Sequence, residues 1–239
     1  MTQQKSFFRP TGVRATRACA RFARLGVLGT LAASAMLAGA GCNIVGMFGA
    51  MEESRRRDST HEVEAEYTNM TGKSWAVIVR ADRSVQADNP ELVDRLTTDL
   101  TRRLIDAQVG AQAAVAADVL RFKYNNPRWV TMNYEDLGKM LGVQRLIVVE
   151  LIEYRLYEPG NKYLYSGRAS ARIGVAEIDS SVPDELMFQK QVDIKFPIKE
   201  GVGSGDLAAP VVNTELAKRL MTRTSWYFFT HQEPYYPEF

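Results

Sequence analysis

Cysteine and histidine are scarce in this sequence, which limits the chemistry that it can carry out. There are two Cys, Cys19 and Cys42, and two His, His61 and His231. Neither His has a Cys, a second His or a carboxylate at the spacing of a metal site, so we expect no zinc site. No Ser–His or Cys–His pairing is evident for nucleophilic catalysis. The sequence therefore predicts no enzyme, no metal and no cofactor.

Acidic residues are absent from the first 24 positions, where six Lys and Arg residues occur. From Leu25 to Gly41 there is no charged residue at all, and small apolar residues predominate. A basic leader, a short apolar stretch and then small residues are typical of a secretory signal. We therefore expect residues 1–41 to be a signal peptide and the folded part of the chain to lie beyond the inner membrane.

The apolar stretch ends at Leu37 to Cys42 (LAGAGC), which resembles the lipobox of bacterial lipoproteins. In that family the Cys thiol is acylated and the Cys becomes the new N-terminus, so the resemblance implies a lipid such as palmitate on Cys42. It also implies a membrane anchor in the cell envelope with the domain on the periplasmic side, at the outer rather than the inner membrane. Gly39 departs from the pattern, because lipoproteins usually have Leu there.

Two other outcomes of export stay open. Ala38 to Ala40 also fits the site of an ordinary signal peptidase, which would release a soluble protein. Alternatively nothing is cut, because the uncharged stretch continues to Met51 and exceeds the roughly 20 residues that span a bilayer. Cysteine usage favours the lipoprotein: the mature chain would keep Cys42 alone, and acylation would remove a free thiol from an oxidising compartment.

The charge balance changes when the leader is removed. The whole chain has 30 basic and 28 acidic residues, and six of the basic ones precede Cys42 while none of the acidic ones do. The mature chain would therefore carry 24 basic and 28 acidic residues. This mildly acidic balance gives no support for binding nucleic acid.

After Cys42 the sequence predicts a tether and then one domain. Residues 42–60 form the expected lipidated N-terminus and tether, with a wholly polar run from Glu52 to Asp58. Arg55 to Arg57 could contact anionic lipid head groups, but their place in a wholly polar run favours a solvated linker. Residues 61–239 are long enough for a single domain with a real core.

The first half of this domain combines strand and helix patterns. Trp75 to Arg80 is a short apolar run typical of a strand. Asn89-Pro90 predicts the start of a helix in which Leu recurs every fourth residue from Leu92 to Leu104. Val115 to Phe122 fits either a strand or a helix. Tyr134 to Leu141 predicts a short helix that Gly142 ends.

The second half predicts three long strands and a last helix. The strands cover Arg145 to Tyr157, about Lys162 to Asp179 and Leu186 to Phe196, and short turns between them predict an antiparallel meander. A Gly-rich loop from Gly201 to Gly205 precedes a helix that we expect Asn213 to cap. The fold class is therefore α+β: a mixed sheet with a C-terminal antiparallel three-strand meander and helices packed mainly on one face.

Two segments resemble the fold shared by the TolB N-terminal domain, the curli secretion lipoprotein CsgG and the penicillin-binding-protein activator LpoB. They are Tyr67 to Gly72 (YTNMTG) and Leu137 to Glu150 (LGKMLGVQRLIVVE). The resemblance implies the same fold over residues 62–230. Arg145 and Glu150 depart from it, because these families usually have an aromatic residue and Gly at those positions.

Two further groups of residues are candidate sites. Glu150 and Glu153 lie three apart on a predicted strand, so we expect them on opposite faces and unable to act as an acid–base couple. The C-terminal tail from Glu233 is too rich in Pro for a helix or strand, so its aromatic residues are hard to bury. We therefore predict a partner surface at Tyr235, Tyr236 and Phe239.

The sequence thus favours a membrane-anchored envelope lipoprotein that acts as a non-enzymatic adaptor or assembly factor through protein contacts. The expected partners are the membrane, through the lipid anchor, and an envelope protein, with self-association as a further option and no nucleic acid. The alternative function, which the resemblance to CsgG implies, is a ring-forming transport or secretion component of the envelope.

Overall fold

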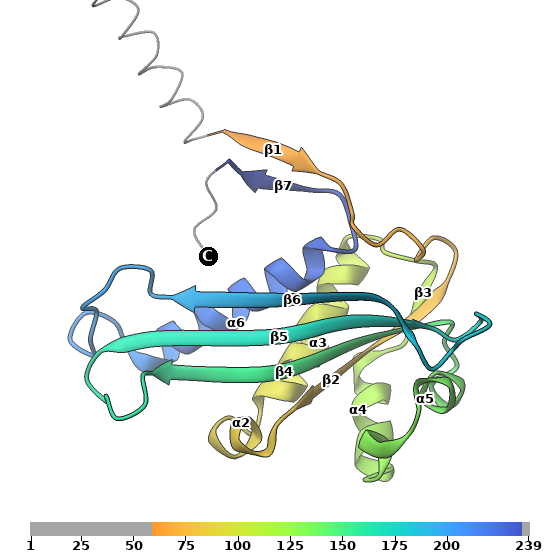
Figure 1. The fold of residues 1–239 in the computed structure, drawn as a ribbon, viewed down its shortest axis with the longest axis horizontal. Coiled ribbons are helices and arrows are strands. Elements are labelled where there is room, and N and C mark those ends of the chain that lie inside the picture. The colour runs from red at the N-terminus through yellow and green to blue at the C-terminus, as the bar shows by residue number, and fades with distance from the viewer. Residues whose placement is uncertain (1–58, 236–239) are drawn as a thin grey trace, which may run out of the picture. The chain divides into compact units, whose positions relative to one another are not determined.

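The apolar stretches of the second half form the centre of a five-stranded mixed sheet. The computed structural model describes residues 59–235 (Figure 1). The strands are β2 (Ser74–Ala81), β3 (Gln112–Ala113), β4 (Arg145–Tyr157), β5 (Tyr165–Glu177) and β6 (Leu186–Phe196), in the spatial order β3-β2-β4-β5-β6. Strand β2 is parallel to β3 and β4, whereas β4, β5 and β6 are antiparallel. The predicted meander is confirmed.

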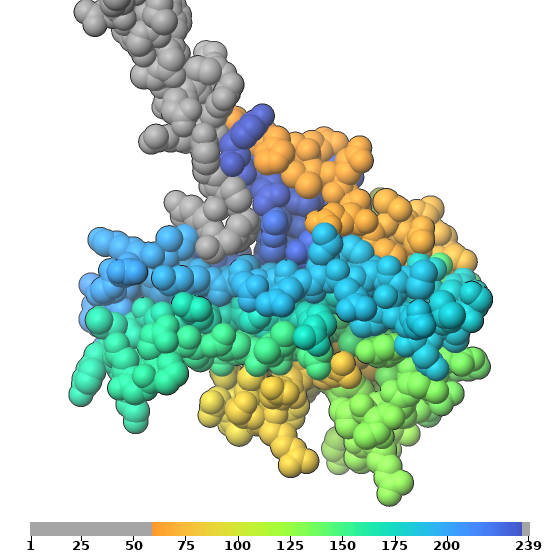
Figure 2. All heavy atoms as spheres, viewed as in Figure 1, coloured from red at the N-terminus to blue at the C-terminus, as the bar shows by residue number. Residues whose placement is uncertain are grey.

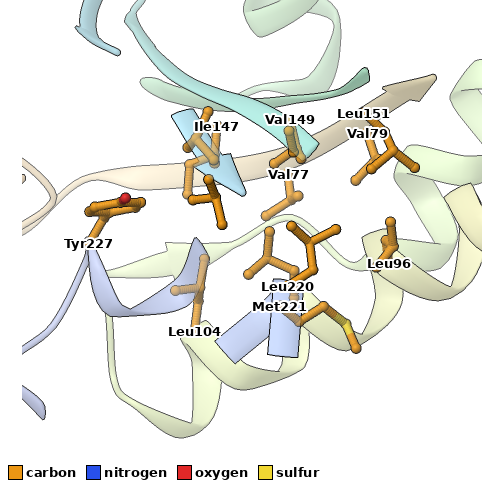
Figure 3. Packing of buried hydrophobic residues seen from close by; sticks show 14 of the residues in the cluster. Val77, Val79, Leu96, Leu104, Ile147, Val149, Leu151, Leu220, Met221 and Tyr227 are labelled. Carbon is orange, nitrogen blue, oxygen red and sulfur yellow. The ribbon is translucent and has the colours of Figure 1, made fainter. Parts of the chain in front are cut away.

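One face of the sheet is covered by the two long helices, α3 (Leu92–Asp106) and α6 (Ala209–Trp226), which pass behind the strands in Figure 1. The Leu residues that recur along α3 are buried, as their spacing predicts. Figure 3 shows Leu96 and Leu104 of α3 and Leu220 of α6 packed under Val77 and Val149 of the central strands. This apolar layer is the main core.

A smaller core lies on the opposite face, at the end where β4 begins. It is formed by α4 (Ala116–Asn125), the 3-10 helix η1 (Trp129–Thr131) and α5 (Tyr134–Leu141), which bury Val119 and Leu137 against Ile78 and Val148. The α+β class is confirmed, with the two longest helices on one face as predicted. The structure adds this second, smaller helical layer.

Three sequence assignments change in the helices. Asn89 does not cap α3: it ends a separate short helix, α2 (Arg83–Asp88), and α3 is preceded by Glu91. Asn213 lies inside α6, because the helix already begins at Ala209 with Pro210 in its first turn, a favoured place for Pro. The ambiguous stretch from Val115 to Phe122 is helical from Ala116 onward, and Val115 is the extended residue that precedes the helix. By contrast α5 is as predicted, with Asn133 as its N-cap and Gly142 in the left-handed conformation after its end.

A bulge in β4 changes which of its side chains share a face. In the pairing with β5, Leu151 lies opposite Ala171 and Glu153 lies opposite Ser170, so Ile152 is an extra residue. An extra residue reverses the alternation of faces. Glu150 and Glu153 therefore lie on the same face of the sheet, and the prediction that they face opposite ways is wrong.

No helix formed by residues 59–235 covers the far half of this second face. In Figure 2 the side chains of β5 and β6 form a broad surface toward the viewer. Within residues 59–235 no helix is both long and apolar enough to cross a membrane.

Candidate functional site

The start and the end of the described chain pair with each other in a separate two-stranded ribbon. Strand β1 (Thr60–Val63) is antiparallel to β7 (His231–Pro234), with Thr60 opposite Pro234 and Val63 opposite His231. The ribbon lies apart from the five-stranded sheet in Figure 1. Two sequence assignments are corrected here: Thr60, placed in the tether, begins a strand, and Glu233 and Pro234, placed in an irregular tail, belong to one.

The inward face of the ribbon brings together both histidines of the chain. His61 lies directly opposite Glu233, and His231 is two residues before that carboxylate. The His231 ring stacks on Trp226 at the end of α6, with ring centroids 4.4 Å apart and planes at 12°. The His61 ring lies 4.9 Å from the ring of Tyr235. The stacking of His231 on Trp226 therefore attaches the ribbon to α6, whereas the contact of His61 with Tyr235 lies within the ribbon and its tip.

An ion pair holds the same face. Arg223 of α6 pairs with Glu233, whose residue surface is only 8% exposed. A buried carboxylate needs such a partner, because an unpaired charge is costly to remove from water. His231 Nε2 lies 3.9 Å from the other carboxylate oxygen of Glu233. The ribbon is thus attached to α6 by one charge pair, Arg223 with Glu233, and by one ring contact, His231 on Trp226, and its opposite face is exposed.

The outward face and the tip of the ribbon are exposed. Thr60, Glu62, Gln232 and Pro234 are exposed, and Tyr235 exposes 51% of its surface although it touches His61. No third strand pairs with either β1 or β7 in the part of the chain that the structure describes. Unpaired strand edges are ready places for another chain to add a strand. Of the predicted partner residues, Tyr235 lies at this tip.

The other predicted site residues, Cys42, Tyr236 and Phe239, lie outside the described residues, as do the signal peptide and most of the tether. The sequence pattern of the ribbon strands is too weak to predict the ribbon. β1 and β7 are four residues each and lie at opposite ends of the domain. Only their pairing brings His61 and His231 to one place.

The acidic and histidine side chains of the described residues do not gather into a metal site. Within residues 59–235 no group of three His, Cys, Asp or Glu side chains is arranged to hold a metal ion. Glu150 and Glu153 share a face but have separate partners. Glu150 accepts a hydrogen bond of 2.9 Å from Arg172 and lies 3.4 Å from Arg80, while Glu153 pairs with Arg155.

The two segments that carry the family resemblance meet at Arg145. This side chain is 5% exposed, pairs with Asp179 and lies 3.5 Å from Glu177. Its Nε also donates to the Asn69 carbonyl at 3.0 Å, and the Tyr67 hydroxyl donates to Glu177 at 2.8 Å. Burial, together with that carboxylate, raises the pKa of Tyr67. Arg145 stands where the resembled families usually have an aromatic residue, and its buried positive charge is balanced by Glu177, at the end of β5, and by Asp179 just after it.

No protein-family model matches the chain, and no curated protein is similar to it. Among solved structures, the lipoprotein GNA1162 from Neisseria meningitidis is 12% identical over 63% of this chain and 96% of that one, with a TM-score of 0.42. The PelC dodecamer from Paraburkholderia phytofirmans is 7% identical over 72% and 97%, with a TM-score of 0.42. The LpoB C-terminal domain from Salmonella enterica is 9% identical over 54% and 84%, with a TM-score of 0.33.

Because these identities and TM-scores are low, neither the family nor the role of these proteins can be assigned to this chain. The resemblance to the TolB N-terminal domain, to CsgG and to LpoB stays a prediction.

Proposed function

We propose that the protein is an envelope lipoprotein, anchored through an acylated Cys42, that works as a non-enzymatic adaptor or assembly factor. The observation that carries the proposal is the β1–β7 ribbon. It lies where the tether joins the domain, both of its strands have unpaired edges among the described residues, and Tyr235 is exposed at its tip. The domain would face the periplasm, at the outer rather than the inner membrane.

Binding at the ribbon would use main-chain hydrogen bonds. A partner segment in extended conformation adds to the edge of β1 or β7, as in other cases of strand addition. An isolated two-stranded ribbon is only marginally stable, so a third strand would also stabilise the ribbon itself. The ring of Tyr235 supplies apolar contact area with little loss of side-chain freedom.

The anchor is tested by replacing Cys42 with Ala and measuring intact mass. The wild type should begin at Cys42 and carry acyl chains, because the thiol is the acylated group. The variant should lack acyl chains and keep residues 1–41. A wild-type chain that begins at Cys42 without acyl chains, or one that begins at Met1, would contradict the anchor.

The ribbon is tested by placing a photo-crosslinking phenylalanine analogue at Tyr235 in cells. The matched control is the same replacement at Tyr163, which is 81% exposed near the start of β5 and far from the ribbon in sequence. We expect a discrete adduct with an envelope protein at position 235 and none at position 163. Equal labelling at the two positions, or no adduct at 235, would contradict contact through the ribbon.

One observation favours the alternative, a ring-forming transport component. Strand β6 is 11 residues long and lies at the edge of the five-stranded sheet, with β5 as its only neighbour among the described strands. A long edge can pair with another copy of the chain. Gel filtration in mild detergent separates the two functions, because a ring elutes as a single large species at all protein concentrations.

A further inference from the structure

A basic groove runs between the two long helices on the side away from the sheet. It encloses about 220 Å³ and is lined by Arg95, Arg102 and Arg103 of α3 and by Lys218 of α6. Asp99 is the one carboxylate among its lining residues. Four cations against one anion leave the groove strongly positive.

Neighbouring carboxylates only partly neutralise these cations. Asp99 pairs with Arg102, and Glu215 lies 3.7 Å from Lys218. No carboxylate in the described part of the chain lies within ion-pair distance of Arg95 or Arg103. Arg95 is half-buried: its Nε has no hydrogen-bond partner among the described residues, but its side chain also interacts with the neutral Tyr154 hydroxyl, so its charge is not neutralised.

The rest of the molecule differs in charge. The mature chain predicted from the sequence is mildly acidic, with 24 basic and 28 acidic residues. On the open face of the sheet, two arginines have carboxylate neighbours: Arg172 donates to Glu150 at 2.9 Å, and Arg168 lies 3.9 Å from Glu158. The excess of positive charge in the groove is therefore a local feature.

The cations of the groove form a stripe, which fits an extended surface better than a single small anion. Arg95 and Arg102 lie seven residues apart on α3, which is about 10 Å along the helix axis. The side chains of Arg102 and Lys218 are 64% and 61% exposed, so they can reach outward. Guanidinium groups match phosphate oxygens in geometry as well as in charge.

We propose that the α3–α6 groove docks on the phosphate head groups of the membrane that holds the anchor. The proposal rests on the lipid anchor proposed above, which keeps the domain close to a membrane surface. Basic residues near an anionic bilayer each add to binding, and a lipid chain combined with a basic patch gives a stable attachment. Docking would fix which side of the domain faces the bilayer, and so where the ribbon points.

The test compares the affinity of the full chain for two kinds of vesicle. One is pure phosphatidylcholine, and the other contains one third phosphatidylglycerol. The double variant Arg102→Gln, Arg103→Gln should lower the ratio of anionic to neutral affinity about tenfold or more at low salt. Lys218→Glu alone should lower the ratio as well, and 0.5 M NaCl should abolish the preference of the wild type, because salt screens the attraction.

The matched control is Arg168→Gln, Lys195→Gln, which removes two cations from the open face of the sheet. It should leave the ratio unchanged, and an equal loss in both double variants would overturn the proposal. Release of the protein by inorganic phosphate at constant ionic strength would indicate a site for a free anion and also overturn docking. Failure of the proposed anchor is distinguished by the intact mass of the wild type, which would then lack acyl chains. The groove variants do not change the N-terminus, so they do not affect that measurement.

Discussion

At the scale of single residues, the buried charge at the end of the sheet is the best defined feature. Arg145 is nearly excluded from water and is shared between Glu177 and Asp179. Removing one partner of a buried pair leaves the others without compensation, which costs more than the pair itself contributes. The side chain is therefore more important for stability than an ion pair on the surface.

Arg145→Met should lower the free energy of unfolding by about 3 kcal/mol, because Glu177 would stay buried without its cation. Arg172→Met is the matched control. It removes the same type of charge from an ion pair whose Arg side chain is 52% exposed, and it should cost less than about 1 kcal/mol. Urea denaturation of both variants measures the difference, and equal losses would show that burial at Arg145 is unimportant.

The same cluster predicts a dependence of stability on pH. The hydrogen bond from Lys73, followed by that from Arg145, holds the pKa of Asp179 below its ordinary value of 3.8. Because the folded-state pKa is the lower one, Asp179 stabilises the fold above about pH 4, and this contribution is lost as the pH falls through the folded-state pKa. Asp179→Asn should therefore be less stable than the wild type at pH 7. The difference in melting temperature between the wild type and Asp179→Asn should become smaller below pH 4. A difference that does not change with pH would contradict a stabilising role of the Asp179 charge.

At the scale of secondary-structure elements, β4 shows how a bulge divides one strand into two parts. Before Ile152 the strand is buried on both faces, with Val148 and Val149 each 3% exposed. After the bulge one face remains in the core through Tyr154, and the other carries Glu153. Tyr154 is anchored by its hydroxyl, which donates to the Asn213 carbonyl at 2.8 Å, and burial raises its pKa to about 12.

This division predicts a large loss of stability for one substitution and a small loss for a similar one. Val149→Asp should destabilise the domain by several kcal/mol or prevent folding, because it buries an unpaired carboxylate. Ile152→Asp places the same group three residues further along the strand, where the native side chain is 39% exposed. It should cost less than about 1 kcal/mol. Similar melting temperatures for the two variants would contradict the position of the bulge.

The elements differ in how well the sequence predicts them. Strands β2, β4 and β6 are predicted within a few residues because apolar runs and alternation are local signals. Helix α5 is predicted because Asn133 and Gly142 mark both of its ends. Asn89 is misassigned because an N-cap and a residue that ends the preceding helix look alike in sequence. The bulge at Ile152 leaves no mark in composition, so the shared face of Glu150 and Glu153 could not be inferred.

At the scale of the whole molecule, the candidate site depends on contacts between distant parts of the chain. The sequence identifies Tyr235 as a residue that is hard to bury. It does not identify the ribbon, because pairing of β1 with β7 is decided by the folded domain between them. The basic groove is hidden for a similar reason: Lys218 joins Arg95, Arg102 and Arg103 only when α6 lies against α3.

The tether predicted between Cys42 and β1 should set how far the domain reaches. A flexible chain of roughly 17 residues has an r.m.s. span of about 20–25 Å. Deleting residues 49–58 leaves β1 intact and should lower the yield of the adduct at Tyr235, with folding and acylation unchanged. A Gly/Ser insertion of the same length is the control and should be tolerated, because effective concentration falls slowly with linker length. Equal losses from deletion and insertion would instead favour a ring with fixed geometry at the membrane.

The pairing of β1 with β7 has a mechanical consequence. Because the two strands are antiparallel, Thr60 and Pro234 lie at the same end of the ribbon. A force applied between the tether at Thr60 and a partner bound at Tyr235 would act on one end of the ribbon. The hydrogen bonds between the strands would then break one pair at a time, starting at that end, and would not share the force. The ribbon would therefore yield at low force while the five-stranded sheet carried almost no load. A domain held between a membrane and a moving partner would in this way lengthen reversibly by a few residues before its core was strained.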